Sequence, residues 1–159
     1  MIKNTIYYLL AIAGLGLTIN YIVNHNKPAD HSVVIDPRLV QYVEEWKSDM
    51  RTNGFNPDKS VASLRSISIE SLDDERLGNT WIYEHRIVVS PSVFEYGDAT
   101  VKSVVYHELG HYVFGLEHGS CELMSFSTWP NEYYSMNWER IKEEYIRVIR
   151  SHEFETRIP

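Results

Sequence analysis

The feature that most constrains the fold is a helical pattern that carries two histidines four residues apart. His107 and His111 lie within residues 98–115, where the remaining pattern predicts a helix. Asp98 is its expected cap and Gly115 its expected end. On such a helix His107 and His111 project from the same side. The apolar residues that recur at helical spacing are Val101, Val104, Val105, Leu109 and Val113.

The histidine pair belongs to a longer pattern, in which residues 107–118 read H-E-L-G-H-Y-V-F-G-L-E-H. Two imidazoles on one helix face can meet one Zn²⁺ at about 2.0–2.1 Å each. Glu108, at the edge of that face, can reach a water on the metal more easily than the metal itself. A chain that turns at Gly115 can return His118 as a third ligand. Three histidines with one open position are typical of catalytic zinc sites; the competing interpretation is a surface helix with incidental histidines.

This stretch resembles the zincins and, within them, the metzincins, whose signature is H-E-x-x-H-x-x-G-x-x-H followed by a Met-turn. The chain differs from that signature by one residue, with three rather than two between His111 and Gly115. It is more similar to small metallopeptidase-like proteins of bacteria and phages, which carry H-E-L-G-H-x-x-x-G-x-x-H and then an S-x-M-like segment. Here residues 122–125, Glu-Leu-Met-Ser, fit that segment. The resemblance implies a minimal zincin-like catalytic domain that acts on peptides or proteins, with Met124 as the apolar floor beneath the metal; an ordinary core methionine is the alternative.

Other polar residues near the motif have weaker claims to the metal. Glu122 and Glu132 are the alternative third ligands in place of His118, and would give a His-His-Glu site. A lone cysteine is more often a small buried residue than a ligand, and tyrosines more often pack. We therefore interpret four further residues as packed or solvated: His85, Cys121, Tyr133 and Tyr134.

The N-terminus contains an uncharged run of 18 residues, Ile6–Val23. A membrane-spanning helix needs about 20 apolar residues, so residues 1–24 are predicted to form a single transmembrane anchor, followed by a linker over 25–31. A cleaved signal peptide and a buried core helix are the alternatives. With Lys3 on the inner side, the domain over 32–159 would lie outside the cytoplasm.

Composition excludes one class of function. Lys and Arg number 15 against 22 Asp and Glu, which gives a net charge of −7 at pH 7. A nucleic-acid-binding domain normally carries a basic footprint, so no nucleic-acid partner is expected. The single cysteine excludes an intramolecular disulfide.

Around the motif, hydrophobic periodicity predicts an α+β domain. In zincins an edge strand beside the active helix pairs with extended peptide, and Ile87-Val88-Val89 is the candidate for that strand, with an inner strand as the alternative. The expected elements are a helix from Asp36-Pro37 to Asn53-Gly54, a loop over 55–62, strands within 65–71 and 81–89, a turn at Gly78-Asn79, and a helix over 137–151.

Together these patterns predict a zinc-dependent metallopeptidase. Its ligands are His107, His111 and His118, and its general base is Glu108. The alternative from another class is a membrane-tethered zinc-binding module without catalytic turnover.

Overall fold

The computed structural model describes residues 32–156 except residue 74, with the backbone alone for 153–156. The chain divides into two units, 1–31 and 32–159, and all described residues lie in the second. This unit is α+β, as predicted. Its elements in chain order are β1 (Val34–Ile35), α2 (Val40–Thr52), α3 (Pro57–Val61), β2 (Ser66–Ile69), β3 (Gly78–Trp81), β4 (Arg86–Val89), the 3-10 helix η1 (Pro91–Glu95), α4 (Asp98–Phe114), the 3-10 helix η2 (Glu122–Met124) and α5 (Asn131–Thr156).

The four strands form one sheet in the order β1-β2-β4-β3. β1, β2 and β4 are parallel, whereas β3 runs antiparallel to β4 with Gly78 opposite Val89 and Trp81 opposite Arg86. β4 therefore lies between β2 and β3, and Ile87, Val88 and Val89 are all buried. The prediction that Ile87-Val88-Val89 is an edge strand is wrong. The edge strands are β1 and β3, and β3 packs against α4.

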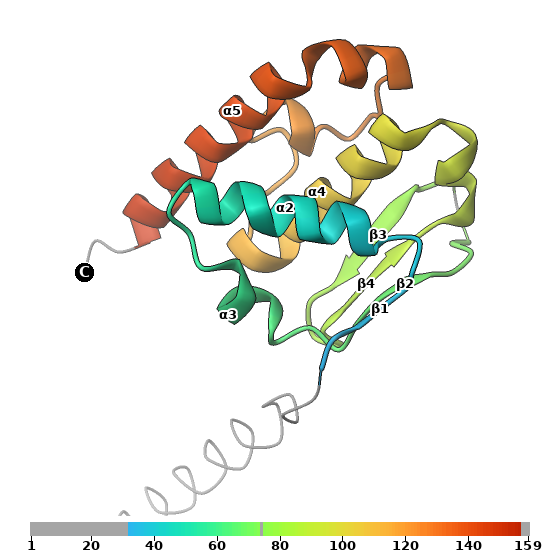
Figure 1. Cartoon of the computed structure of the whole chain (residues 1–159), viewed down its shortest axis with the longest axis horizontal. Helices are drawn as coiled ribbons and strands as arrows, with labels where there is room; N and C mark the ends of the chain where they lie inside the picture. The colour runs from blue at the N-terminus through green and yellow to red at the C-terminus, as the bar shows by residue number, and fades with distance from the viewer. Residues whose placement is uncertain (1–31, 74, 157–159) are drawn as a thin grey trace, which may run out of the picture. The chain divides into compact units, whose positions relative to one another are not determined.

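Helix α4 is the centre of the domain. It packs against β3 and β4 on one side and against α2 and α5 on the other, and the helices lie together beside the sheet in Figure 1. This arrangement buries nine of its 17 residues. A helix enclosed in this way is apolar around most of its circumference, which leaves a narrow strip for chemistry.

Both ends of α4 have defined caps. At the C-terminal end Gly115 adopts a left-handed conformation, with φ of 63°, and ends the helix as predicted. At the N-terminal end the side chain of Asn131, at the start of α5, accepts a hydrogen bond of 2.9 Å from the amide of Ala99. The predicted cap, Asp98, is instead the first residue of the helix. The cap thus comes from a residue 32 positions later in the chain, which no local pattern indicates.

Other boundaries differ from the prediction for identifiable reasons. The side chain of Asp36 accepts a bond of 3.0 Å from the amide of Arg38, so it closes a turn and α2 begins later, at Val40. Asn56 caps the short helix α3, in a region predicted to be loop. The prediction of a turn at Gly78-Asn79 is wrong, because both residues belong to β3 and pair with β4.

No helix within residues 32–156 is long and apolar enough to cross a membrane. The predicted transmembrane segment, Ile6–Val23, lies outside the described residues. It stays a prediction.

The hydroxyl group of a buried tyrosine links the three long helices through hydrogen bonds. The hydroxyl of Tyr145 on α5 donates a bond of 3.0 Å to the carbonyl oxygen of Tyr106 on α4. It also accepts a longer bond, 3.4 Å, from the indole nitrogen of Trp46 on α2. Tyr145 and Trp46 are both fully buried, so water cannot replace either bond. One hydroxyl group therefore links α5 to both α4 and α2.

We expect Tyr145→Phe to lower the free energy of unfolding by about 1–3 kcal/mol, because it leaves the Trp46 N–H buried without a partner. Urea denaturation of the two proteins measures the change. Tyr83→Phe is the matched control, since Tyr83 is 99% exposed, and it should change stability by less than about 0.5 kcal/mol. Equal effects of the two substitutions would contradict the role assigned to Tyr145.

Candidate metal centre

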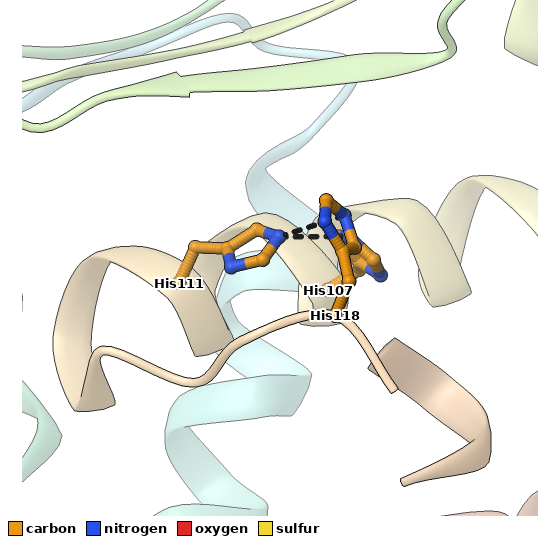
Figure 2. A group of neighbouring side chains, drawn as sticks. All are labelled: His107, His111 and His118. Carbon is orange, nitrogen blue, oxygen red and sulfur yellow. Dashed lines mark hydrogen bonds between the residues drawn. The ribbon is translucent and has the colours of Figure 1, made fainter. Parts of the chain in front are cut away.

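Three histidines converge on the exposed strip of α4. His107 and His111 come from the helix, and His118 comes from the segment that follows Gly115 (Figure 2). Their Nε2 atoms form a nearly equilateral triangle. The separations are 3.0 Å between His107 and His111, 3.1 Å between His107 and His118, and 3.2 Å between His111 and His118.

Backbone carbonyl groups set the orientation of two of these rings. The Nδ1 of His107 lies 2.8 Å from the carbonyl oxygen of Leu123, and that of His111 lies 2.5 Å from the carbonyl oxygen of Leu116. A carbonyl oxygen can only accept, so each Nδ1 carries the proton. In a neutral ring the lone pair is then on Nε2, which faces the centre of the triangle. Metal-binding histidines in proteins are oriented by this kind of bond.

Burial favours the neutral form of both helix histidines. It lowers the pKa of His107 to about 4, and the neighbouring histidines act in the same direction. Burial likewise lowers the pKa of His111. Two unprotonated Nε2 atoms 3.0 Å apart repel each other, and a cation between them converts that repulsion into attraction.

The triangle fits a metal ion. Nitrogens bound at about 2.0–2.1 Å to a tetrahedral ion are about 3.3 Å apart, a few tenths of an ångström more than the observed separations. These are also the three residues of the described part of the chain whose ligand atoms cluster closely enough to hold an ion. The three histidines can therefore hold a metal.

His118 reaches the triangle although one more residue separates it from His111 than in the metzincin signature. The amide of Leu116 donates to the carbonyl oxygen of Gly110, so the chain reverses tightly after Gly115. Unlike the other two histidines, His118 is exposed. Its ring packs against that of Phe126, with centroids 4.3 Å apart and planes 31° apart. Phe126 is itself 83% exposed, so an aromatic surface borders the open side of the site.

Met124 lies beneath the helix segment that carries both histidines. It is fully buried in η2. A Cβ atom placed on Gly110 would be 2.9 Å from its sulfur and 3.0 Å from the hydroxyl oxygen of Tyr145. Only a glycine at position 110 permits this approach, which positions η2 so that Leu123 can accept from His107. Met124 therefore packs as a floor under α4.

Glu108 is buried on the side of α4 that faces β3. Its side chain is 5% exposed, and its Oε2 accepts a hydrogen bond of 2.7 Å from the hydroxyl of Thr80. Burial raises the pKa of Glu108 to about 7, and the bond from Thr80 and the charge of Arg76 oppose that rise. A Cβ on Gly78 would lie 2.6 Å from Oε1 of the same carboxyl group. The strand therefore encloses the carboxyl group on two sides.

The alternative third ligands are not in the cluster. Glu122 forms a bidentate ion pair with Arg140, at 2.9 and 3.1 Å, and this pairing lowers its pKa. Glu132 lies in the first turn of α5. The hydroxyl of Tyr133 accepts a bond from Arg140, and Cys121 is buried with a free thiol. None of these belongs to the candidate metal cluster.

Sequence reasoning missed the groups that surround the ligands. The carbonyl groups of Leu116 and Leu123 have no side-chain signature, so no pattern could identify them. Gly78 and Thr80 lie 28–30 residues before Glu108, and only the packing of β3 against α4 brings them to it. The contact between Gly110 and Met124 could have been inferred from the glycine inside the helix.

Comparisons of the chain with protein-family models, curated proteins and solved structures gave no match.

The geometry predicts one divalent ion per chain, measurable by competition between the full chain and a chromogenic chelator for Zn²⁺. His107→Ala and His111→Ala should each weaken binding by more than the roughly 10–100-fold that loss of an outer-shell partner produces. His118→Ala should also weaken it, because His118 completes the triangle. His85→Ala is the control: His85 is bonded to Tyr112 and lies outside the cluster. Equal affinity of the wild type and all three triad variants would exclude the site.

A second prediction concerns the contact between Gly110 and Met124. Alanine normally stabilises a helix interior relative to glycine by about 1 kcal/mol, but Gly110→Ala should do the opposite. The new Cβ forces Met124 and Tyr145 away from α4, and overpacking of this kind lowers stability by about 1–3 kcal/mol. Denaturant unfolding determines the sign. A Gly110→Ala variant more stable than the wild type would show that Met124 and Tyr145 can move away from α4 without loss of stability.

Proposed function

We propose that this protein is a zinc-dependent peptidase in which Glu108 is the general base. The observation that carries the proposal is the juxtaposition of two kinds of group on consecutive residues. One is a triangle of imidazole nitrogens, of which those of His107 and His111 direct their lone pairs inward. The other is the buried carboxyl group of Glu108, which accepts a hydrogen bond from Thr80. Structural zinc sites are usually closed by four protein ligands, whereas three imidazoles leave a position open.

The donor set supports zinc. Three imidazole ligands suit zinc, copper, iron and nickel better than magnesium or calcium, which prefer oxygen ligands. A facial triangle of nitrogens with similar separations suits the tetrahedral preference of zinc. When bound, zinc would act as a Lewis acid that polarises a peptide carbonyl and lowers the pKa of water.

Glu108 would carry the proton during hydrolysis. Its Oε2 is occupied by the bond from Thr80, so Oε1 is the atom proposed to accept the proton of the attacking water. The water oxygen bonds to the carbonyl carbon, and the carbon–nitrogen bond then breaks. Glu108 returns the proton to the leaving amine, which completes the balance.

The sheet supports a peptide as the substrate. β3 is an edge strand and packs against α4 next to Glu108. An extended peptide can add to such an edge through main-chain hydrogen bonds, independently of its side chains. In this proposal the role first assigned to Ile87-Val88-Val89 passes to Gly78–Trp81. The predicted anchor at Ile6–Val23 would hold the reaction next to a membrane.

Glu108→Gln is the direct test. The variant should bind zinc as the wild type does, because Glu108 is outside the triad, and it should lose at least about 100-fold in cleavage of a mixed peptide library. Glu117→Gln removes an exposed glutamate near the same turn and should keep full activity. Mass spectrometry of the cleaved library and chelator competition provide the two measurements.

Two outcomes would contradict the proposal. Cleavage by Glu108→Gln at the wild-type rate would exclude Glu108 as the base. Tight zinc binding by the wild type without cleavage of any library peptide would favour a zinc-binding module without turnover.

A further inference from the structure

We propose that Thr80 is a positioning residue that sets the orientation of the Glu108 carboxyl group, with Gly78 providing the space for it. This inference rests on the proposed function, since it concerns the geometry of the same base. It extends that function to the edge strand, whose side chains then act on the reaction as well as its backbone.

Successive residues of a β-strand face opposite sides of the sheet. Gly78 and Thr80 are two residues apart on β3, so they face the same side of the sheet. That side is covered by α4, because both residues contact Glu108 on the helix. The first of the two positions has no side chain, and the second has a short side chain with one hydroxyl group.

These two residues constrain the carboxyl group in different ways. A Cβ at Gly78 would lie 2.6 Å from Oε1 and 2.9 Å from Cγ of Glu108, closer than packed atoms approach. The carboxyl group therefore occupies space that any other residue at this position would fill. The hydroxyl of Thr80, at 2.7 Å from Oε2, makes the two carboxyl oxygens inequivalent. Oε2 accepts from the strand, and Oε1 remains for proton transfer.

The same hydroxyl also lies 3.1 Å from the backbone carbonyl oxygen of Glu108. Thr80 is thus in contact with both the backbone and the side chain of one residue, and it limits the rotation between them. General bases are effective only within a narrow range of positions, and an error of about 1 Å can reduce the rate about 100-fold. A hydroxyl in this place restricts the base without a charge that would hold its proton away.

The position of Thr80 has a consequence for substrate binding. Its side chain contacts the base while its backbone belongs to the edge strand proposed to pair with peptide. A peptide that pairs with β3 would therefore align with the strand that orients the base. Strand β3 would then set both the register of the substrate and the direction of Oε1.

The test uses the full chain with three substitutions. Thr80→Val removes the hydroxyl and keeps the shape, whereas Thr80→Ser keeps the hydroxyl. Thr100→Val is the matched control on α4, because the Thr100 hydroxyl is buried and has no hydrogen-bond partner among the described residues. Zinc affinity, kcat and KM for a cleaved library peptide, and crystal structures of the zinc-loaded variants are measured.

We expect Thr80→Val to bind zinc as the wild type does and to keep KM within about twofold, with kcat lower by about 10–100-fold. In its crystal structure the Glu108 carboxyl group should be rotated or occupy several positions. Thr80→Ser should recover kcat to within about threefold of the wild type and restore a single position of the Glu108 carboxyl group. Thr100→Val should change neither kcat nor the position of that carboxyl group.

Three results would overturn the inference. They are an unchanged kcat in Thr80→Val, a Glu108 carboxyl group in the same single position in Thr80→Val and Thr80→Ser, and an equal loss of kcat in Thr100→Val. If the wild type cleaves no peptide, the peptidase proposal fails separately. The crystal structures then decide the role of Thr80, since the position of Glu108 does not depend on turnover.

Discussion

The enclosure of α4 between the sheet and two helices is the constraint on which the rest of the molecule depends. Tyr145 donates to the helix backbone at Tyr106, and Met124 packs against it at Gly110. Rotation or sliding of α4 would create a clash at Met124 or break the bond to Tyr145. His107 and His111 are carried on this helix, so the packing of α4 sets where both residues lie.

The histidine centre is assembled from parts of the chain that have different tasks. α4 supplies two imidazoles, the reversal after Gly115 supplies the third, and η2 supplies a carbonyl group that sets one tautomer. The edge strand supplies the hydroxyl that holds Glu108. The proposed base Glu108 shares α4 with two of the ligands, whereas the groups that orient these residues come from the segment after Gly115, from η2 and from β3.

The sequence predicted what depends on local spacing. The α4 helix, its end at Gly115 and the α+β class are confirmed, because apolar periodicity and a glycine stop act within a few residues. The convergence of the three histidines also follows from spacing, once a turn at Gly115 is assumed. Contacts between residues far apart in the sequence could not be predicted from local spacing. The cap from Asn131, the approach of Thr80 to Glu108 and the inner position of β4 all depend on how whole elements pack.

The cap at Asn131 has a consequence for the segment between α4 and α5. This segment leaves α4 at Gly115, and Asn131 returns it to the other end of the same helix, at Ala99. His118, Met124 and Phe126 all lie within this segment. They provide a proposed ligand, a residue packed against Gly110 of α4, and an aromatic border of the site. In the first half of the segment, Leu116, Leu123 and Met124 contact α4. The exposed residues from Phe126 to Trp129 do not take part in those contacts. Changes of length or sequence there would reshape the border of the site while His107 and His111 keep their orienting bonds. The selectivity of the site can therefore change without a change of the two helix ligands.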